Sequence, residues 1–160
     1  MLGAKVVIRV GTTGGIVDRV QLGDVIVPNE AVPLDGATQA YLKQGGEPVP
    51  DMRLTSALAS RSERAGLRCH IGKICTSDTF YLEEERESQA WASKGALSFE
   101  MECAVIFTLG KLRGYMAGAI LTVTGIIGTH DRVLDDIVTL ESIEKSAAVA
   151  LDTVTSIDIQ

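Results

Sequence analysis

An arginine lies in the middle of an otherwise apolar stretch near the start of this 160-residue chain. Arg9 stands between Ile8 and Val10, and the run passes directly into Gly11-Thr12-Thr13-Gly14-Gly15. A guanidinium inside an apolar strand is unfavourable unless an anion pairs with it. A glycine-rich turn exposes backbone N–H groups that can hold an oxyanion, and arginine suits phosphate. The pattern favours an anion site, with pairing of Arg9 to an internal carboxylate as the alternative.

Two carboxylates flank a methionine in Glu100-Met101-Glu102, just before the apolar run Cys103–Phe107. Carboxylates in this position can accept hydrogen bonds from the hydroxyls of a sugar. They also stabilise the N-terminus of a helix, where the helix dipole is positive. From the residues alone, the helix-terminus interpretation is the stronger of the two.

A polar segment with two adjacent aromatics forms a third cluster, Ser77-Asp78-Thr79 followed by Phe80-Tyr81. Such a pair can stack on a planar base, although two ordinary core aromatics are the alternative. The acids Glu83-Glu84-Glu85 then indicate a solvated helix start, where Arg86 pairs with one of them or points at a ligand carbonyl. His130-Asp131-Arg132 fits either a mobile lid or a plain surface loop.

Strands and helices are expected to alternate along the chain. The patterns predict strands over Lys5–Val10, Leu67–Cys75 and Gly118–Val123, with a turn and short strand over Leu22–Pro28. They predict helices over Met52–Gly66, Glu83–Lys94, Phe99–Leu112 and Leu134–Ile157, and a long loop over Asn29–Pro50. The continuous apolar runs suit strands covered on both faces. The alternation indicates a three-layer α/β domain.

The chain carries a net charge of −6. Its basic residues are scattered singly, apart from Arg61, Arg64 and Arg68, which we interpret as a solvated helix face. Nucleic-acid binding demands clustered Lys and Arg, so nucleic acid is excluded as a partner. No apolar run is long enough to span a bilayer, and Met1–Lys5 lacks the pattern of a signal peptide. We therefore expect a cytoplasmic protein with no membrane partner.

The three cysteines, Cys69, Cys75 and Cys103, lie in apolar settings. An odd number in such settings indicates buried, reduced thiols rather than a disulfide framework. With only two histidines to join them, no metal-ligand spacing is present.

Taken in chain order, these clusters resemble the purine/uridine phosphorylase family of nucleoside phosphorylases, most closely its uridine phosphorylases. The matching segments are Arg9–Gly14, Gly23-Asp24-Val25, Ser77–Tyr81, Arg86 and Glu100-Met101-Glu102. Each alone is weak, but the ordered set is specific and covers nearly the whole chain. The resemblance implies one domain over residues 1–160, a three-layer αβα fold with a central mixed sheet.

The resemblance also implies a role for each matching residue. Phosphate binding falls to Arg9, Gly11 and Thr12. Ribose binding falls to Glu100, Met101 and Glu102. Base binding falls to Thr13, Gly14, Phe80, Glu84 and Arg86. Arg9 and Glu102 are the implied catalytic residues.

The implied reaction is reversible phosphorolysis of a nucleoside to free base and ribose 1-phosphate. Phosphate attacks C1′ while the ribosyl ring gains oxocarbenium character, so positioning and electrostatic stabilisation supply the catalysis. No covalent enzyme nucleophile is needed. The implied partners are a nucleoside and inorganic phosphate, with phosphate as co-substrate, no cofactor and no metal. A homo-oligomer, dimer or hexamer, is expected, with a role in pyrimidine salvage.

Three departures from the family pattern bear on these expectations. Glu84 stands where uridine phosphorylases carry glutamine, and an ionised glutamate only accepts hydrogen bonds, which suits a ring N–H donor such as that of guanine. No acid follows Thr122-Val123-Thr124, where purine phosphorylases carry an aspartate. The family's N-terminal glycine-arginine loop is not found before Arg9, so we expect the C-terminal two-thirds of the family domain.

Uridine is therefore the expected substrate, and three alternatives stay open. The first alternative is a purine nucleoside phosphorylase. The second is a truncated, catalytically impaired chain that binds a nucleoside. A nucleosidase that uses water is the third, although the hydrolases of this family usually lack the buried arginine seen at Arg9.

Overall fold

The computed structural model describes residues 3–80, 85–128 and 137–158. Within them the strands are β1 (Val6–Gly15), β2 (Val25–Pro33), β3 (Cys69–Thr76), β4 (Ala96–Glu100) and β5 (Met116–Ile126). The helices are α1 (Gly36–Leu42), α2 (Met52–Arg64), α3 (Glu85–Ala92), α4 (Cys103–Arg113) and α5 (Ile137–Ser156). The predicted α/β class is confirmed.

The five strands form one mixed sheet in the order β1-β4-β3-β2-β5, which closes on itself. The β1–β5, β2–β3 and β3–β4 pairs are parallel, whereas β2–β5 and β1–β4 are antiparallel. β1 meets β4 only through Gly14 opposite Phe99 and Gly15 opposite Ser98. The sheet is therefore closed by the C-terminal ends of two strands, and this junction lies beside the site described below.

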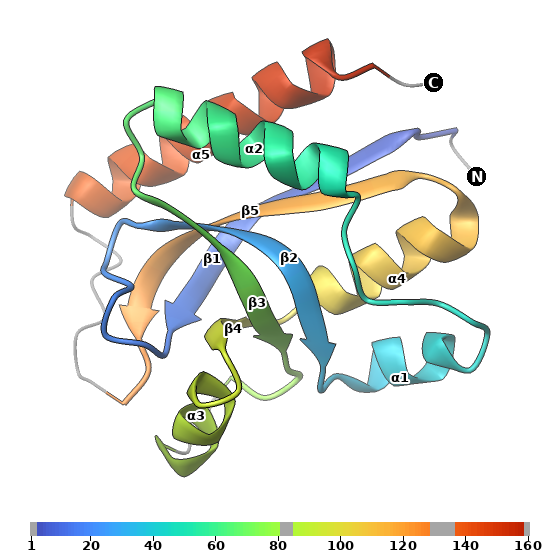
Figure 1. Ribbon diagram of the computed structural model, residues 1–160, viewed down its shortest axis with the longest axis horizontal. Helices are drawn as coiled ribbons and strands as arrows, with labels where there is room; N and C mark the ends of the chain where they lie inside the picture. Colours follow the sequence, from blue (N-terminus) through green and yellow to red (C-terminus); the bar gives the residue numbers. More distant parts are fainter. Residues whose placement is uncertain (1–2, 81–84, 129–136, 159–160) are drawn as a thin grey trace.

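Helices cover the sheet on two faces (Figure 1), as the predicted three layers require. α2 and α5 pack against each other on one face, where α2 contacts β2, β3 and β5, and α5 contacts β1 and β5. α4 packs on β2, β3 and β5 on the other face, with α1 beside it, and α3 lies next to β4.

The apolar strands β2 and β5 serve both faces at once, because successive side chains of a strand point in opposite directions. Val25, Val27 and Ile120 belong to the core cluster that includes residues of α2 and α5. Ile26 and Leu121 belong to the opposite cluster, which includes residues of α4. Residues 25–28 of β2 and 117–123 of β5 are buried. The continuous apolar run predicted this burial for β5, whereas the similar run in β1 is less covered, with Val10 42% exposed.

The glycine-rich run after Arg9 is a strand, so the predicted turn is wrong. β1 continues through Gly15, and Gly11-Thr12-Thr13 pairs with Leu121, Thr122 and Val123 of β5. None of these glycines has a positive φ. As in any strand, side chains alternate between faces: Thr12 is exposed and Thr13 is buried. The run thus presents threonine side chains from a fixed strand rather than amides from a loop.

The segment before the predicted helix Phe99–Leu112 is a strand that sequence patterns missed. Phe99 and Glu100 complete β4, and α4 begins only at Cys103. The Glu100 carboxylate accepts the backbone N–H groups of Glu102 and Cys103, so the chain can pass from strand to helix within two residues. Gly114 then ends α4 in the left-handed conformation, as expected from its sequence.

Other boundaries also differ from the expected ones. The predicted loop over residues 29–50 contains the end of β2 and helix α1, whose N-cap Asp35 accepts a hydrogen bond from the Thr38 N–H. Helix α5 is confirmed, but two of the apolar residues whose spacing of three and four predicts it, Leu140 and Leu151, are 49% and 66% exposed. Ser and Thr side chains share the buried face with Val149 and Ala150, and the Thr153 hydroxyl donates to the Val149 backbone oxygen.

The arginines Arg61, Arg64 and Arg68 do not form one solvated helix face. Arg61 pairs with Asp152 of α5 through Nε and Oδ2, 2.7 Å apart, and so joins the two helices of one face. Arg68 lies beyond α2 and donates to the backbone oxygen of Arg19.

The three cysteines are free thiols, as expected, and Cys75 and Cys103 are buried. Burial raises the pKa of Cys69 to about 11 and of Cys75 to about 12, and raises the pKa of Cys103 well above its usual value.

Across residues 3–80, 85–128 and 137–158, no group of three His, Cys, Asp or Glu side chains could hold a metal ion. In the same ranges, no helix has the length and apolar character to cross a membrane.

Candidate active site

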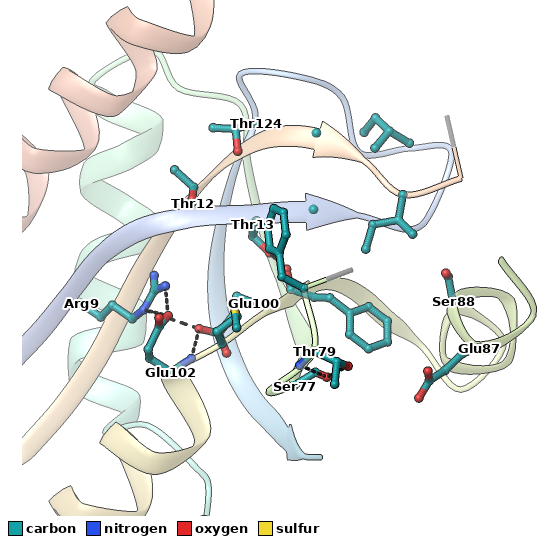
Figure 2. Close-up of a pocket in the computed structure, with 17 residues that line it drawn as sticks. Arg9, Thr12, Thr13, Ser77, Thr79, Glu87, Ser88, Glu100, Glu102 and Thr124 are labelled. Carbon is teal, nitrogen blue, oxygen red and sulfur yellow. Dashed lines mark hydrogen bonds and ion pairs between the residues drawn. The ribbon is translucent and has the colours of Figure 1, made fainter. Parts of the chain in front are cut away.

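A cavity of about 250 Å³ lies where the C-terminal ends of β1, β3, β4 and β5 converge (Figure 2). This is the position at which α/β sheets commonly bind ligands. Of the residues predicted for the site, those that line the cavity are Arg9, Thr12, Thr13, Gly14, Phe80, Glu100, Met101 and Glu102. The structure therefore brings together three segments that lie far apart in the sequence.

Two predicted residues of the described part of the chain do not line the cavity. Gly11 lies on β1 outside the lining, and Arg86 is exposed on α3 and does not line the cavity either. Glu84 lies outside the described residues, as do Tyr81 and the segment His130-Asp131-Arg132. The roles of Glu84 and Arg86 in base binding stay predictions.

Arg9 is paired with carboxylates of the same chain. Pairing with an internal carboxylate was the alternative to an anion site in the sequence. Its Nε donates to Glu102 Oε2 at 3.0 Å and lies 3.5 Å from Glu100 Oε2, and its Nη2 also bonds Glu102. Burial opposes the positive charge, but Cys103 and the two glutamates outweigh it and raise the pKa of Arg9. Among the described residues, no acceptor bonds the buried Nη1 atom, so one guanidinium nitrogen can still serve an oxyanion.

Gly11 lies directly beneath the Arg9 side chain. A Cβ at position 11 would overlap the Nη1 atom of Arg9 and stand 3.0 Å from its Nη2. Gly11 therefore contributes to the site without lining it, because its missing side chain leaves the space that the guanidinium occupies.

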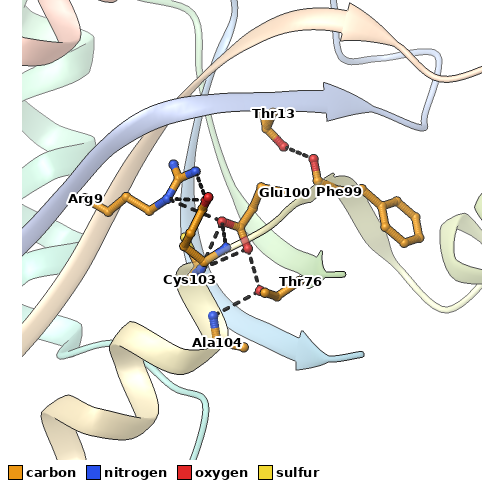
Figure 3. Close-up of polar contacts among 8 residues, drawn as sticks. Arg9, Thr13, Thr76, Phe99, Glu100, Cys103 and Ala104 are labelled. Carbon is orange, nitrogen blue, oxygen red and sulfur yellow. Dashed lines mark hydrogen bonds and ion pairs between the residues drawn. The ribbon is translucent and has the colours of Figure 1, made fainter. Parts of the chain in front are cut away.

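Glu100 joins three elements at the floor of the site (Figure 3). Its side chain is 0% exposed, and its oxygens accept the N–H groups of Glu102 and Cys103, both at 2.9 Å. The Thr76 hydroxyl, at the end of β3, donates to Glu100 and accepts from the Ala104 N–H at 3.0 Å. The first N–H groups of α4 are thus satisfied by two side chains from strand ends.

Glu102 is the exposed member of the glutamate pair. Its side chain is 52% exposed, against 0% for Glu100, and neighbouring Met101 is 38% exposed. Glu102 occupies the N-cap position of α4 but makes no side-chain capping bond. Its carboxylate turns to Arg9 across the cavity instead, where a ligand hydroxyl can reach it (Figure 2).

The far end of the cavity is more apolar. Phe80 is 51% exposed there, and Phe99, Ile126 and Ile127 add apolar surface. The Thr13 hydroxyl donates to the Phe99 carbonyl at 2.7 Å, so its proton is already engaged. A Cβ at Gly14 would stand 3.0 Å from Ile127 Cγ1, so a methyl group there would displace the Ile127 side chain. This end can receive a flat ring.

Several lining residues had no predicted role: Ser77, Thr79, Glu87, Ser88, Phe99, Thr124, Gly125, Ile126 and Ile127. The segment from Thr124 to Ile127 lies at the end of β5, and β5 is parallel to β1, so both strands end at one edge. Knowledge of the β1–β5 pairing would have predicted that residues 124–127 line the site. Glu87 and Ser88 come from the exposed helix α3, whose sequence carries no comparable signal.

The comparison with known protein families agrees with this geometry. Residues 1–157 match the family model described as the phosphorylase superfamily. The chain belongs to that superfamily, and the resemblance stated from its motifs is confirmed.

Individual relatives narrow the comparison. The uridine phosphorylase of Salmonella typhimurium is 29% identical over 160 residues, which cover 91% of this chain and 62% of that protein. A uridine phosphorylase structure from Vibrio fischeri superposes with a TM-score of 0.87 at 31% identity, covering 97% of this chain and 65% of that one. A purine nucleoside phosphorylase from Toxoplasma gondii, in complex with immucillin-H, gives 0.85 at 26%, covering 95% and 63%. The chain thus spans less than two thirds of each.

Proposed function

We propose that this chain carries the site of a nucleoside phosphorylase, which converts uridine and phosphate reversibly to uracil and ribose 1-phosphate. The observation that carries the proposal is a single cavity with Arg9 and Glu102 at one end and Phe80 at the other. The similarity to uridine phosphorylases from Salmonella and Vibrio supports it.

Each end of the cavity has a role in this proposal. Phosphate binds the free Nη1 of Arg9 and the exposed Thr12 side chain. Glu102 accepts hydrogen bonds from ribose hydroxyls while Met101 packs on the sugar, and the base stacks on Phe80. When ribose binds, Glu102 therefore gives up hydrogen bonds from Arg9 and accepts hydrogen bonds from the ribose hydroxyls. The Arg9 guanidinium can then donate more of its N–H groups to phosphate.

The chemistry needs no group beyond these. The bond from C1′ to the base nitrogen breaks as a phosphate oxygen bonds C1′, and the departing base takes a proton from phosphate or solvent. Positive charge on the ribosyl ring is stabilised by the phosphate beneath it, which Arg9 holds in place. The residues proposed as catalytic are thus Arg9 and Glu102, without metal or organic cofactor.

The wider setting is part of the same proposal. The chain acts in the cytoplasm in pyrimidine salvage, as a homo-oligomer, either a dimer or a hexamer. The net charge of −6 without a basic cluster supports the absence of a nucleic-acid partner.

A purine nucleoside is the second candidate substrate. The similarity to the Toxoplasma purine nucleoside phosphorylase favours it, as does Glu84, which accepts hydrogen bonds where glutamine would also donate. Thr124 at the end of β5 counts against it, since no acid stands at this place to protonate a purine.

Base release from a panel of nucleosides, with and without phosphate, tests the proposal. We expect uracil from uridine only when phosphate is present, and less base from inosine or guanosine. Purine release in excess of uracil would favour the second candidate, and release without phosphate would indicate a nucleosidase. Calorimetric binding of uridine without turnover would show a nucleoside-binding chain with no phosphorylase activity.

A further inference from the structure

We propose that Glu100 is a positioning residue rather than a ribose ligand: its buried carboxylate holds Arg9 and the backbone of Glu102 in place. One side chain that touches neither substrate would then set the geometry of both the phosphate and the ribose contacts. The inference rests on the proposed function, and it departs from the role that the family resemblance implies for this residue.

The carboxylate of Glu100 already accepts hydrogen bonds from three protein groups and forms an ion pair with Arg9. An ionised carboxylate has about four acceptor directions. Those of Glu100 face the Thr76 hydroxyl, the N–H groups of Glu102 and Cys103 at 2.9 Å, and Arg9 Nε at 3.5 Å. With its side chain 0% exposed, Glu100 could bond a ribose hydroxyl only by leaving a backbone N–H unpaired.

The contacts of Glu100 are those that fix its neighbour. Glu102 N and Cys103 N are among the N–H groups that a helix leaves unsatisfied at its start. A carboxylate there forms charge-assisted bonds and also interacts favourably with the helix dipole. Because Glu100 holds the N–H of Glu102 itself, it determines where the Glu102 side chain leaves the backbone.

Glu100 also determines what happens to Arg9 when substrates bind. Two carboxylates face one guanidinium in the structure, one buried and one exposed. When the exposed Glu102 turns to the ribose, Glu100 is the internal anion that still faces Arg9 Nε. A carboxylate fixed by a helix terminus keeps the guanidinium aimed at phosphate through this exchange.

The substitution Glu100→Gln tests the proposal, because it keeps the shape but removes the charge and sets an amide N–H₂ against backbone donors. We expect the KM for phosphate and the KM for the nucleoside to rise together, each about tenfold, as for lost charge-assisted contacts. Glu102→Gln should raise mainly the KM for the nucleoside.

A substrate that lacks a hydroxyl separates positioning from contact. If Glu102 bonds the ribose 2′-hydroxyl, the effect of Glu102→Gln should shrink on 2′-deoxyuridine. The effect of Glu100→Gln should be the same on uridine and 2′-deoxyuridine, to within about twofold, because no interaction between Glu100 and the hydroxyl is lost. An effect of Glu100→Gln that shrinks on 2′-deoxyuridine would overturn the proposal.

Two further variants serve as controls for Glu100→Gln. Asp51 caps α2 by accepting the N–H groups of Arg53 and Leu54 and does not line the cavity, so Asp51→Asn, the same change of a capping carboxylate to an amide, should leave both KM values unchanged. Thr76→Val removes one bond to Glu100 and should reproduce the Glu100→Gln pattern at smaller size. It also replaces Glu100→Gln if that variant does not fold.

A readout without turnover keeps this proposal separate from the proposed function. Amide hydrogen exchange at Glu102 and Cys103 should quicken at least tenfold in Glu100→Gln, since both N–H groups lose a charged acceptor. Calorimetry should show weaker binding of inorganic phosphate. If the wild-type chain releases no base, the proposed function fails while the exchange result still decides the role of Glu100. Unchanged exchange at both amides would refute the positioning role.

Discussion

The two ends of the cavity are built in different ways. The Arg9 end consists of strand and helix termini tied by ion pairs and capping bonds, with Arg9 and Glu100 fixed by several partners each. The Phe80 end consists of a loop, an exposed helix and the last residues of β5, and its aromatic ring is half exposed. The end proposed to carry the chemistry is thus rigid, and the end proposed to hold the base is adaptable.

This difference has a physical basis. Charge stabilisation requires donors that are already in place, since reorganisation during the reaction would consume the gain. A flat base needs only apolar surface and a few polar groups, which loops can supply in many arrangements. Substitutions at the two ends should therefore affect different quantities.

Loss of Arg9 should give the largest effect. Arg9→Ala removes the only proposed cation at the phosphate position and leaves Glu100 without its ion partner. Hydrogen bonds to charged groups contribute about 1.5–3 kcal/mol each, so we expect the KM for phosphate to rise about 100-fold. Uridine binding, measured by calorimetry without phosphate, should change little. Equal losses for both substrates would show that Arg9 is only structural and that the two ends are not independent.

Gly11→Ala should produce the same type of effect at lower magnitude. The new methyl group would overlap Arg9 Nη1, so the guanidinium must move, whereas the backbone is unstrained because φ is not positive. We expect the KM for phosphate to rise about tenfold, with the KM for uridine within twofold of wild type.

Gly14→Ala is the control for Gly11→Ala, because it places a methyl group beside Ile127 at the other end. It should raise the KM for uridine and spare that for phosphate. Identical profiles for the two glycine variants would remove the distinction between the ends.

Elements with a local sequence pattern were predicted, and elements that depend on distant pairing were not. Periodic apolar spacing predicted α2 and α5, and continuous apolar runs predicted strands at β1 and β5, because long regular elements leave a local signature. Five-residue β4 leaves none, and its last residues were assigned to the next helix. The pairing of β1 with β5 joins segments about a hundred residues apart and has no local signal.

The site was predicted through ordered motifs, which identify residue types but not their contacts. Glu100 and Glu102 look equivalent in the sequence, yet one is buried beneath α4 and the other reaches the cavity. Helix α5 shows the same limit, since Leu140 and Leu151 were expected from their spacing to face the core but are exposed, while Ser and Thr side chains share the buried face with Val149 and Ala150. Which face of an element is covered depends on distant neighbours, and spacing does not encode it.

Phe80→Ala should affect the base end alone. A half-exposed ring contributes little to folding, so stability should fall by less than about 0.5–1 kcal/mol. Stacking on a base is worth about 1–3 kcal/mol, and partial loss predicts a rise of about five- to tenfold in the KM for uridine. Phe80→Trp should preserve most of the affinity. A change in the KM for phosphate would mean that the base end also helps to position the anion.

Cys103→Ala should have the smallest effect on activity, within about twofold at neutral pH, because the buried thiol contacts neither proposed substrate. Its consequence should appear only in alkaline solution. Burial raises the pKa of Cys103 above that of an unfolded thiol, so the folded chain keeps a proton that the unfolded chain releases as the pH passes about 9.

Stability should therefore fall as the pH rises above about 9, by up to about 1.4 kcal/mol per pH unit for each such thiol. Cys75 adds to this slope until its own folded pKa of about 12 is reached. Urea midpoints measured between pH 8 and pH 10.5 should decline less steeply in Cys103→Ala than in the wild type. Equal slopes would mean that the Cys103 thiol ionises as easily in the folded chain as in the unfolded one. Water would then reach Cys103 at the Arg9 end of the cavity.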